Sequence, residues 1–158
     1  MKTNIKFILL LPVLFLVFSC KTNTATKVDN ATERALKGDW EITAVNYPGS
    51  DVIKVNSFNI AQAQCMVGSQ WKFVSNNNTG TMNVQKAGCP SFASPITWFI
   101  NKEGNFVMKI LDTGGKAKTV KEGYILTVSN ISENNFDLID KINVGGKMTD
   151  VVYSFRRT

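Results

Sequence analysis

The clearest indication of the fold class is the stretch Gly38-Asp39-Trp40-Glu41-Ile42-Thr43-Ala44-Val45. Apolar and polar residues alternate along it, so an extended backbone places Trp40, Ile42 and Ala44 on one face. The same period of two recurs in seven later segments, which are 70–73, 81–85, 96–100, 106–110, 124–128, 136–139 and 149–156. Turn sequences such as Asn76–Gly80 and Asn101–Asn105 separate neighbouring segments. The pattern predicts an all-β chain of eight antiparallel strands, joined mostly in hairpin order.

Eight antiparallel strands in up-and-down order are enough to close a small barrel, whose interior is either filled by side chains or holds one small ligand. A two-sheet sandwich is the alternative, but hairpin connections do not require crossovers between sheets and therefore favour the barrel. Residues 46–70 form a connection too long for a hairpin loop. We expect a short helix or flap in the 50–65 region, lying over one mouth of the barrel.

The first residues have the composition of a targeting segment. Lys2 and Lys6 precede an apolar run of 12 residues, 7–18. Such a run is too short to span a bilayer, which needs about 20 residues, but it matches the apolar core of a secretory signal peptide. We therefore predict a signal peptide over residues 1–19. The alternatives are an ordinary secretory signal followed by an incidental Cys, and an N-terminal anchor helix.

The end of this run, Val17-Phe18-Ser19-Cys20, resembles the lipobox of bacterial lipoproteins. The resemblance implies cleavage before Cys20 and attachment of fatty acyl chains, palmitate among them, so that the chain is anchored to a membrane by lipid. Lys21 is similar to the residue that follows the lipidated Cys in lipoproteins sent to the outer membrane, which implies a location in the bacterial envelope facing the periplasm. Residues 20–35 are polar and predict a flexible tether, with a helical turn within 31–37.

Residues 36–158 are predicted to be one domain, and several of its segments resemble the lipocalin-like domain of small bacterial lipoproteins. The start of the first strand, Gly38-Asp39-Trp40, is similar to the Gly-x-Trp signature of lipocalins, and Phe155-Arg156-Arg157 is similar to the closing segment with its Arg. Segments 65–73 and 76–80 add to the resemblance. It implies a lipocalin-type barrel in which Gly38, Trp40 and Arg156 are structural residues, with the Arg156 guanidinium packed on the Trp40 indole.

Two cysteines remain once Cys20 is assigned to the lipid. Cys65 and Cys89 lie just before the second strand and just after the third, so hairpin pairing brings them to the same end of the sheet. In an oxidising compartment two such residues usually pair, and we predict a Cys65–Cys89 disulfide. A pair of redox-active thiols is the alternative, but the spacing is not CxxC and no base is near in sequence.

Composition excludes several classes of function. The chain has no His, which removes every mechanism that depends on imidazole. Loss of residues 1–19 lowers the basic count from 18 to 16 against 12 acidic side chains, a net charge of +4, and this charge is too small and too dispersed to indicate a nucleic-acid partner. Asp137 and Asp140 fall on opposite faces of one strand, unlike a catalytic carboxylate pair. We expect no cofactor and no metal site, and the function least favoured is that of an enzyme acting through carboxylates or a Lys.

Binding of a small apolar ligand is the function that these observations favour. The candidate lining comes from the inward faces of six predicted strands: Ile42, Phe73, Trp98, Phe106, Met108, Tyr124 and Phe136. The same side chains would serve equally well as a packed interior. In that case the domain is a protein-interaction or structural module of the envelope, with an exposed apolar patch around Tyr47-Pro48 or Phe92. The identity of a ligand, the protein partners and the oligomeric state are left open by the sequence.

Overall fold

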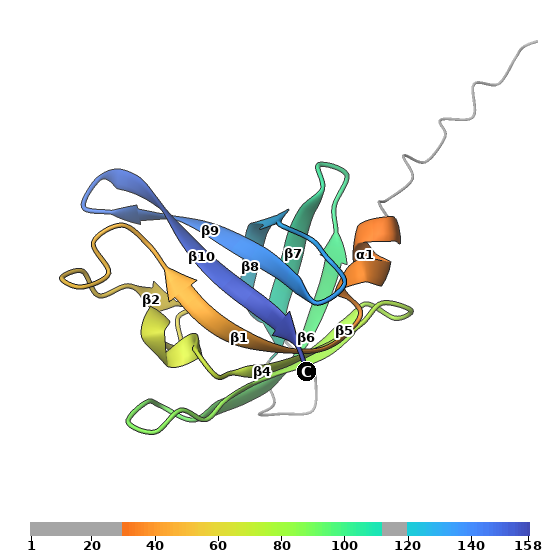
Figure 1. Cartoon of the computed structure of the whole chain (residues 1–158), viewed down its shortest axis with the longest axis horizontal. Coiled ribbons are helices and arrows are strands. Elements are labelled where there is room, and N and C mark those ends of the chain that lie inside the picture. Colours follow the sequence, from red (N-terminus) through yellow and green to blue (C-terminus); the bar gives the residue numbers. More distant parts are fainter. Residues whose placement is uncertain (1–29, 112–119) are drawn as a thin grey trace, which may run out of the picture.

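A computed structural model of the chain describes residues 30–111 and 120–158, and the predicted signal peptide, Cys20 and the first part of the tether lie outside these ranges. The barrel strands are β1 (Gly38–Asn46), β4 (Gln70–Val74), β5 (Thr79–Val84), β6 (Phe92–Ile100), β7 (Asn105–Leu111), β8 (Val120–Ser129), β9 (Asn135–Val144) and β10 (Lys147–Arg157). They form a closed antiparallel barrel in the order β1-β10-β9-β8-β7-β6-β5-β4 (Figure 1). The predicted all-β, eight-stranded up-and-down barrel is therefore confirmed.

Alternation of apolar and polar residues places the core inside the barrel, and a bulge interrupts this alternation on β1. Trp40 and Ile42 are fully buried, as the period of two requires. A β-bulge between Ile42 and Ala44 then shifts the register against β10. The next inward side chain is consequently Val45, which is 4% exposed, and the prediction that Ala44 shares the face of Trp40 is wrong. A bulge adds one residue to one strand and so reverses the alternation beyond it.

The short helix α1 (Asn30–Leu36) covers one end of the barrel. Leu36 is fully buried, and its carbonyl oxygen accepts a hydrogen bond of 2.8 Å from the Trp40 indole N–H. The Glu33 carboxylate accepts a hydrogen bond of 3.0 Å from the backbone N–H of Ile100, at the end of β6. These contacts fasten the helix to the barrel, so residues 30–35, which were predicted as part of the tether, belong to the described fold.

The connection between β1 and β4 contains a small hairpin and a turn of 3-10 helix. The hairpin consists of β2 (Asn56–Ser57) and β3 (Ala61–Gln62), and the 3-10 helix η1 (Ala63–Met66) follows it directly. Phe58 and Asn59, at the tip of the hairpin, have φ angles of 54° and 51°, in the left-handed region. The predicted flap thus exists, and its tip folds into the barrel, since Phe58 is 3% exposed.

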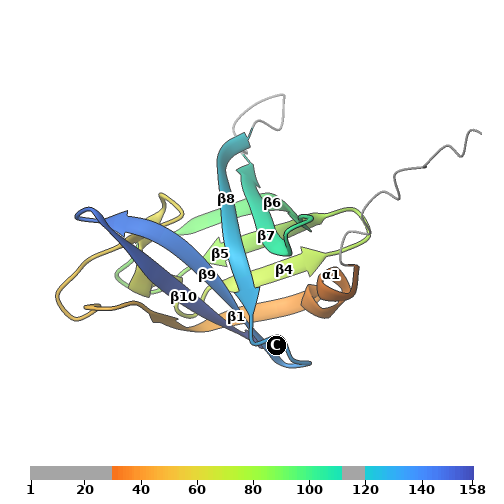
Figure 2. The ribbon, with the colours of Figure 1, turned by 90° about the horizontal axis from the view of Figure 1, so that it is seen from above.

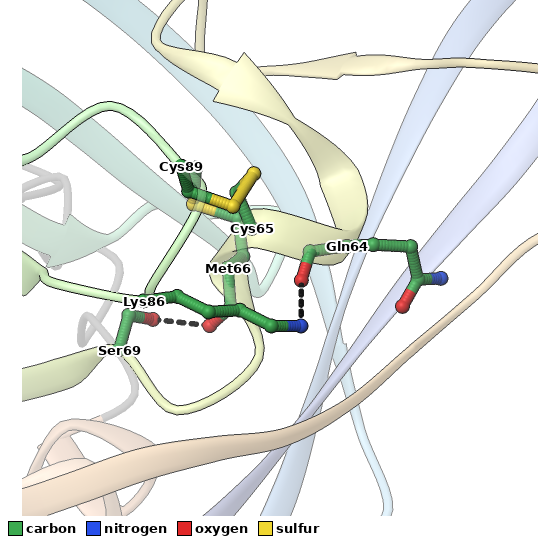
Figure 3. Close-up of a disulfide and its surroundings, with 6 residues drawn as sticks. All are labelled: Gln64, Cys65, Met66, Ser69, Lys86 and Cys89. Atoms are coloured by element: carbon green, nitrogen blue, oxygen red, sulfur yellow. Dashed lines mark hydrogen bonds between the residues drawn. A yellow bond between two sulfur atoms is a disulfide. The ribbon is translucent and has the colours of Figure 1, made fainter.

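The predicted disulfide between Cys65 and Cys89 is confirmed. Cys65 lies in η1 and Cys89 in the connection between β5 and β6 (Figure 3). Close by, the Lys86 ammonium donates a hydrogen bond of 2.7 Å to the carbonyl oxygen of Gln64. The bridge and this hydrogen bond both fasten the segment that follows the hairpin to the rim of the barrel.

Candidate functional site

The residues predicted to line a ligand site all face the barrel interior, but they divide into two groups by exposure. Six of them are at most 1% exposed: Ile42, Phe73, Trp98, Phe106, Met108 and Phe136. Tyr124 is partly exposed and packs against the edge of the core. The division follows position along the barrel, because Phe73, Trp98, Phe106 and Phe136 lie toward the end that α1 covers.

At the end covered by α1, aromatic rings fill the interior. Phe136 stacks on Phe155 with ring centroids 4.5 Å apart, and Trp98 stacks on Phe106 at 5.5 Å. Phe73 contacts both stacks, at 5.3 Å from Trp98 and 6.2 Å from Phe155. Edge-to-face and offset pairs of this kind are the favourable geometries for aromatic packing. In this half of the barrel the predicted lining residues make the contacts of a packed core.

The predicted structural signature is correct for Gly38 and Trp40 but wrong for the arginine. The guanidinium over the Trp40 ring belongs to Arg157, whose Cζ lies 4.1 Å from the ring centroid. Arg157 also donates to the carbonyl oxygens of Lys37 and Ala35, at 2.9 and 3.0 Å. Arg156 is exposed and pairs in register with Glu41. Strand alternation explains the difference, because Phe155 faces inward and its next neighbour must face outward.

Gly38 is required by this same arrangement. Its φ angle is 130°, which L side chains rarely adopt, and a Cβ atom there would clash with the Arg157 guanidinium. The glycine therefore allows Arg157 to close the barrel over Trp40.

At the opposite end, the interior is occupied by Phe58 from the β2–β3 hairpin. Its ring stacks on Tyr153 with centroids 5.0 Å apart and meets Tyr124 edge-on at 5.2 Å. The neighbouring Ser57 hydroxyl shares a buried hydrogen bond of 2.7 Å with the Tyr153 hydroxyl. Burial raises the pKa of the Tyr153 hydroxyl above its usual range, so this group stays protonated. The sequence predicted a flap here but did not predict which side chain enters the barrel.

The half of the barrel around Phe58 is less fully packed than the half that α1 covers. Four side chains on the inward faces of β8 and β9 are only partly buried: Tyr124, Asp140, Ile142 and Val144. Burial raises the pKa of the Asp140 carboxyl. The odd separation of Asp137 and Asp140 predicted that they lie on opposite faces, and alternation with Phe136 and Leu138 places Asp140 on the inward face.

The strands that carry these side chains separate at this end. Pairing between β8 and β9 covers three residue pairs, from Ser129↔Asp137 to Thr127↔Ile139. The strands themselves are longer, each of 10 residues. Figure 2 shows β8 turning away from β9 and β10 beyond the paired stretch. The backbone pairing of the barrel is therefore shortest next to the partly buried side chains.

A pocket of about 480 Å³ lies at the rim, between the hairpin segment and the β5–β6 connection. Its lining is mixed in polarity: Asn56, Ile60, Ala61, Gln62, Gln64, Cys65, Lys86, Gly88, Cys89 and Pro90. Because the disulfide forms part of this lining, the pocket lies where the flap is fastened to the barrel. A volume of this size is within the range of small-molecule sites.

The exposed apolar surface differs from the predicted one. Tyr47 is 8% exposed, because it faces inward beyond the β1 bulge, and Phe92 packs partly against the core. An apolar row instead crosses the outer wall, where Phe99, Val107 and Ile125 are cross-strand partners on β6, β7 and β8. Phe99 and Ile125 are 41% and 65% exposed.

Within the part of the chain that the structure describes, no three His, Cys, Asp or Glu side chains gather as metal ligands. No helix in that part is long and apolar enough to cross a bilayer.

No family model matches the sequence, and no curated protein matches it. Among solved structures, the chain is similar to bovine odorant-binding protein in complex with a selenium-containing odorant, with a TM-score of 0.46, 10% identity, and coverage of 80% of this chain and 72% of that one. For odorant-binding protein from bovine nasal mucosa the TM-score is 0.44 and the identity 13%, with coverage of 78% and 72%. The strand pairing, rather than these likenesses, establishes the barrel.

Proposed function

We propose that this chain is a lipid-anchored protein of the bacterial envelope whose barrel binds one small, largely apolar molecule beside Phe58. One observation carries the proposal: the inward side chains of β8 and β9 near Phe58 stay partly exposed, whereas those around Phe73 are fully buried. A molecule that enters between these two strands gains apolar contact without displacing the packed aromatic core. The hairpin tip then acts as a flap at the same place.

Replacing Phe58 with Ala tests the proposal. We expect the unmodified full chain, held in lipid nanodiscs, to bind benzyl alcohol at a single saturable site. We expect Phe58→Ala to bind it about tenfold more tightly, because the phenyl group of the probe can then fill the buried space of the missing ring instead of packing against the ring; tenfold corresponds to about 1.4 kcal/mol. Isothermal titration calorimetry against empty nanodiscs measures both affinities.

Phe99→Ala is the matched control, because it removes the same ring from the outer wall, where Phe99 is 41% exposed. Its affinity should equal that of the unmodified chain. If the unmodified chain shows no saturable binding, the barrel is a filled core. The favoured function is then an interaction module that uses the outer apolar row Phe99, Val107 and Ile125.

The lipid anchor is tested separately with Cys20→Ala. Acyl chains on residue 20 would hold the protein on the membrane, since each buried CH₂ contributes about 0.8 kcal/mol to membrane binding. In bacteria fed an alkyne analogue of palmitate, we expect this variant to lose the label and to leave the membrane fraction almost completely. Cys65→Ala should keep both the label and the membrane location. Undiminished labelling of Cys20→Ala would contradict the anchor.

A further inference from the structure

The Asp140 carboxylate faces the barrel interior without a stabilising polar contact among the described residues. Asp140 follows Phe136 and Leu138 on the inward face of β9, and its partner across β10 is Val151, which is fully buried. Because cross-strand partners share a face, this register places the carboxylate inside the barrel. Among the residues that the structure describes, it makes neither a hydrogen bond nor an ion pair. Its neighbour Lys141 is paired on the outside with Asp150, at 2.9 Å.

The side chains beside this carboxylate are aromatic. Tyr153 follows Val151 by two residues on the inward face of β10, so it is the diagonal cross-strand neighbour of Asp140. The ring of Phe58 stacks on Tyr153 and meets Tyr124 edge-on. Burial also raises the pKa of Asp140, because a carboxylate is costly to hold in such surroundings without a positive partner. No Lys or Arg side chain among those described supplies that partner.

Asp140 lies at the end of the paired stretch of β8 and β9, where its side chain is partly exposed. The last pair between β8 and β9 is Thr127↔Ile139, so Asp140 is the first residue of β9 beyond the paired stretch. The two strands diverge from that point (Figure 2). Asp140 is accordingly only partly buried, unlike Leu138, the previous inward residue, which is 2% exposed. Asp140 is therefore a partly exposed carboxylate on the inward face, at the point where β9 is no longer paired with β8.

We propose that the ligand is a small organic amine, with a protonated ammonium group that pairs with Asp140 and an apolar body that packs against Phe58 and Tyr124. This inference rests on the proposed function and specifies its ligand class. A carboxylate with aromatic faces beside it is suited to a cation, through a charge-assisted hydrogen bond and cation–π attraction. The ammonium supplies the counter-charge that the described part of the fold does not give Asp140.

The test uses three probes with the same phenyl body, which are benzylamine, benzyl alcohol and benzoate. We titrate the full chain in lipid nanodiscs at pH 7 by calorimetry, with empty nanodiscs as the blank. The unmodified chain is expected to bind benzylamine at least about tenfold more tightly than benzyl alcohol, and benzoate more weakly than either. Asp140→Asn is expected to lose this preference, because it keeps the size of the side chain but not the charge.

Asp137→Asn is the matched control, because it removes a carboxylate from the outer face of the same strand. It should keep the preference for benzylamine. A second variant, Asp140→Ser, must lose the preference as well, and the melting temperature of each variant shows that it is folded. Retention of the preference in both Asp140 variants overturns the amine proposal. Equal binding of benzylamine and benzyl alcohol to the unmodified chain overturns it too, but leaves the apolar site intact. Failure of all three probes overturns the proposed function itself.

Discussion

Phe73→Ala is expected to lower the free energy of unfolding by about 3–5 kcal/mol, the usual cost of removing a buried aromatic ring. Phe73 is 1% exposed, and its ring contacts those of Trp98 and Phe106 at 5.3 and 5.5 Å. It also meets Phe136 and Phe155, at 6.3 and 6.2 Å. Because rigid strands hold these neighbours, they cannot move together to fill the space, and the cavity adds to the lost transfer free energy.

Guanidinium unfolding followed by tryptophan fluorescence measures this loss. Phe99→Ala makes the same chemical change on the outer wall and should cost at most about 1 kcal/mol. Phe73→Leu should lie between the two, because it keeps part of the buried volume. A Phe73→Ala variant no less stable than Phe99→Ala would mean that the rings near α1 do not form the core described above.

The double variant Cys65→Ser/Cys89→Ser is expected to lose about 3–4 kcal/mol of stability, for a bridge that closes a loop across 24 positions. The bridge limits the conformations of the unfolded chain, and in the folded chain it ties η1 to the β5–β6 connection. Since η1 directly follows the hairpin, its release should also loosen the placement of Phe58 over the barrel mouth.

Two comparisons isolate the effect of the bridge. Dithiothreitol should lower the stability of the unmodified chain to that of the double variant and leave the variant itself unchanged. Ser91→Ala alters an exposed residue of the same connection and should have little effect. Equal stability of the double variant and the unmodified chain would show that the bridge contributes nothing to the fold.

The existence of the strands could be predicted from the sequence more reliably than the face on which each of their side chains lies. Each of the eight predicted strands exists, because alternation reports directly which face is buried. The wrong predictions concern Ala44 and Arg156. In each case the inward residue lies one position further along the strand, and a shift of one residue moves a side chain to the opposite face. The bulge on β1 turned Ala44 away and brought Val45 inward. On the last strand the inward arginine is Arg157, one residue beyond the one that the family pattern suggested.

The candidate site could be predicted only in part. The inward direction of Tyr124 followed from its strand pattern, and that of Asp140 could have followed in the same way. The insertion of Phe58 into the barrel could not be predicted in this way. Its hairpin has strands of two residues and a tip with positive φ angles at Phe58 and Asn59, and such a segment has no alternating pattern of burial. The early end of β8–β9 pairing depends on how the whole sheet twists and closes, which is a property of all eight strands together.

The all-β class, the strand order and the Cys65–Cys89 bridge could be predicted from the amino-acid sequence, because periodicity, turn residues and cysteine positions are local properties. Which inward side chains are fully buried and which stay partly exposed could be seen only in the closed barrel. The rings around Phe73 pack against one another, whereas Asp140 and Tyr124 lie where two strands part, beside a ring supplied by a distant hairpin. Packing depends on the distances between residues far apart in the chain, and those distances exist only once the barrel has closed.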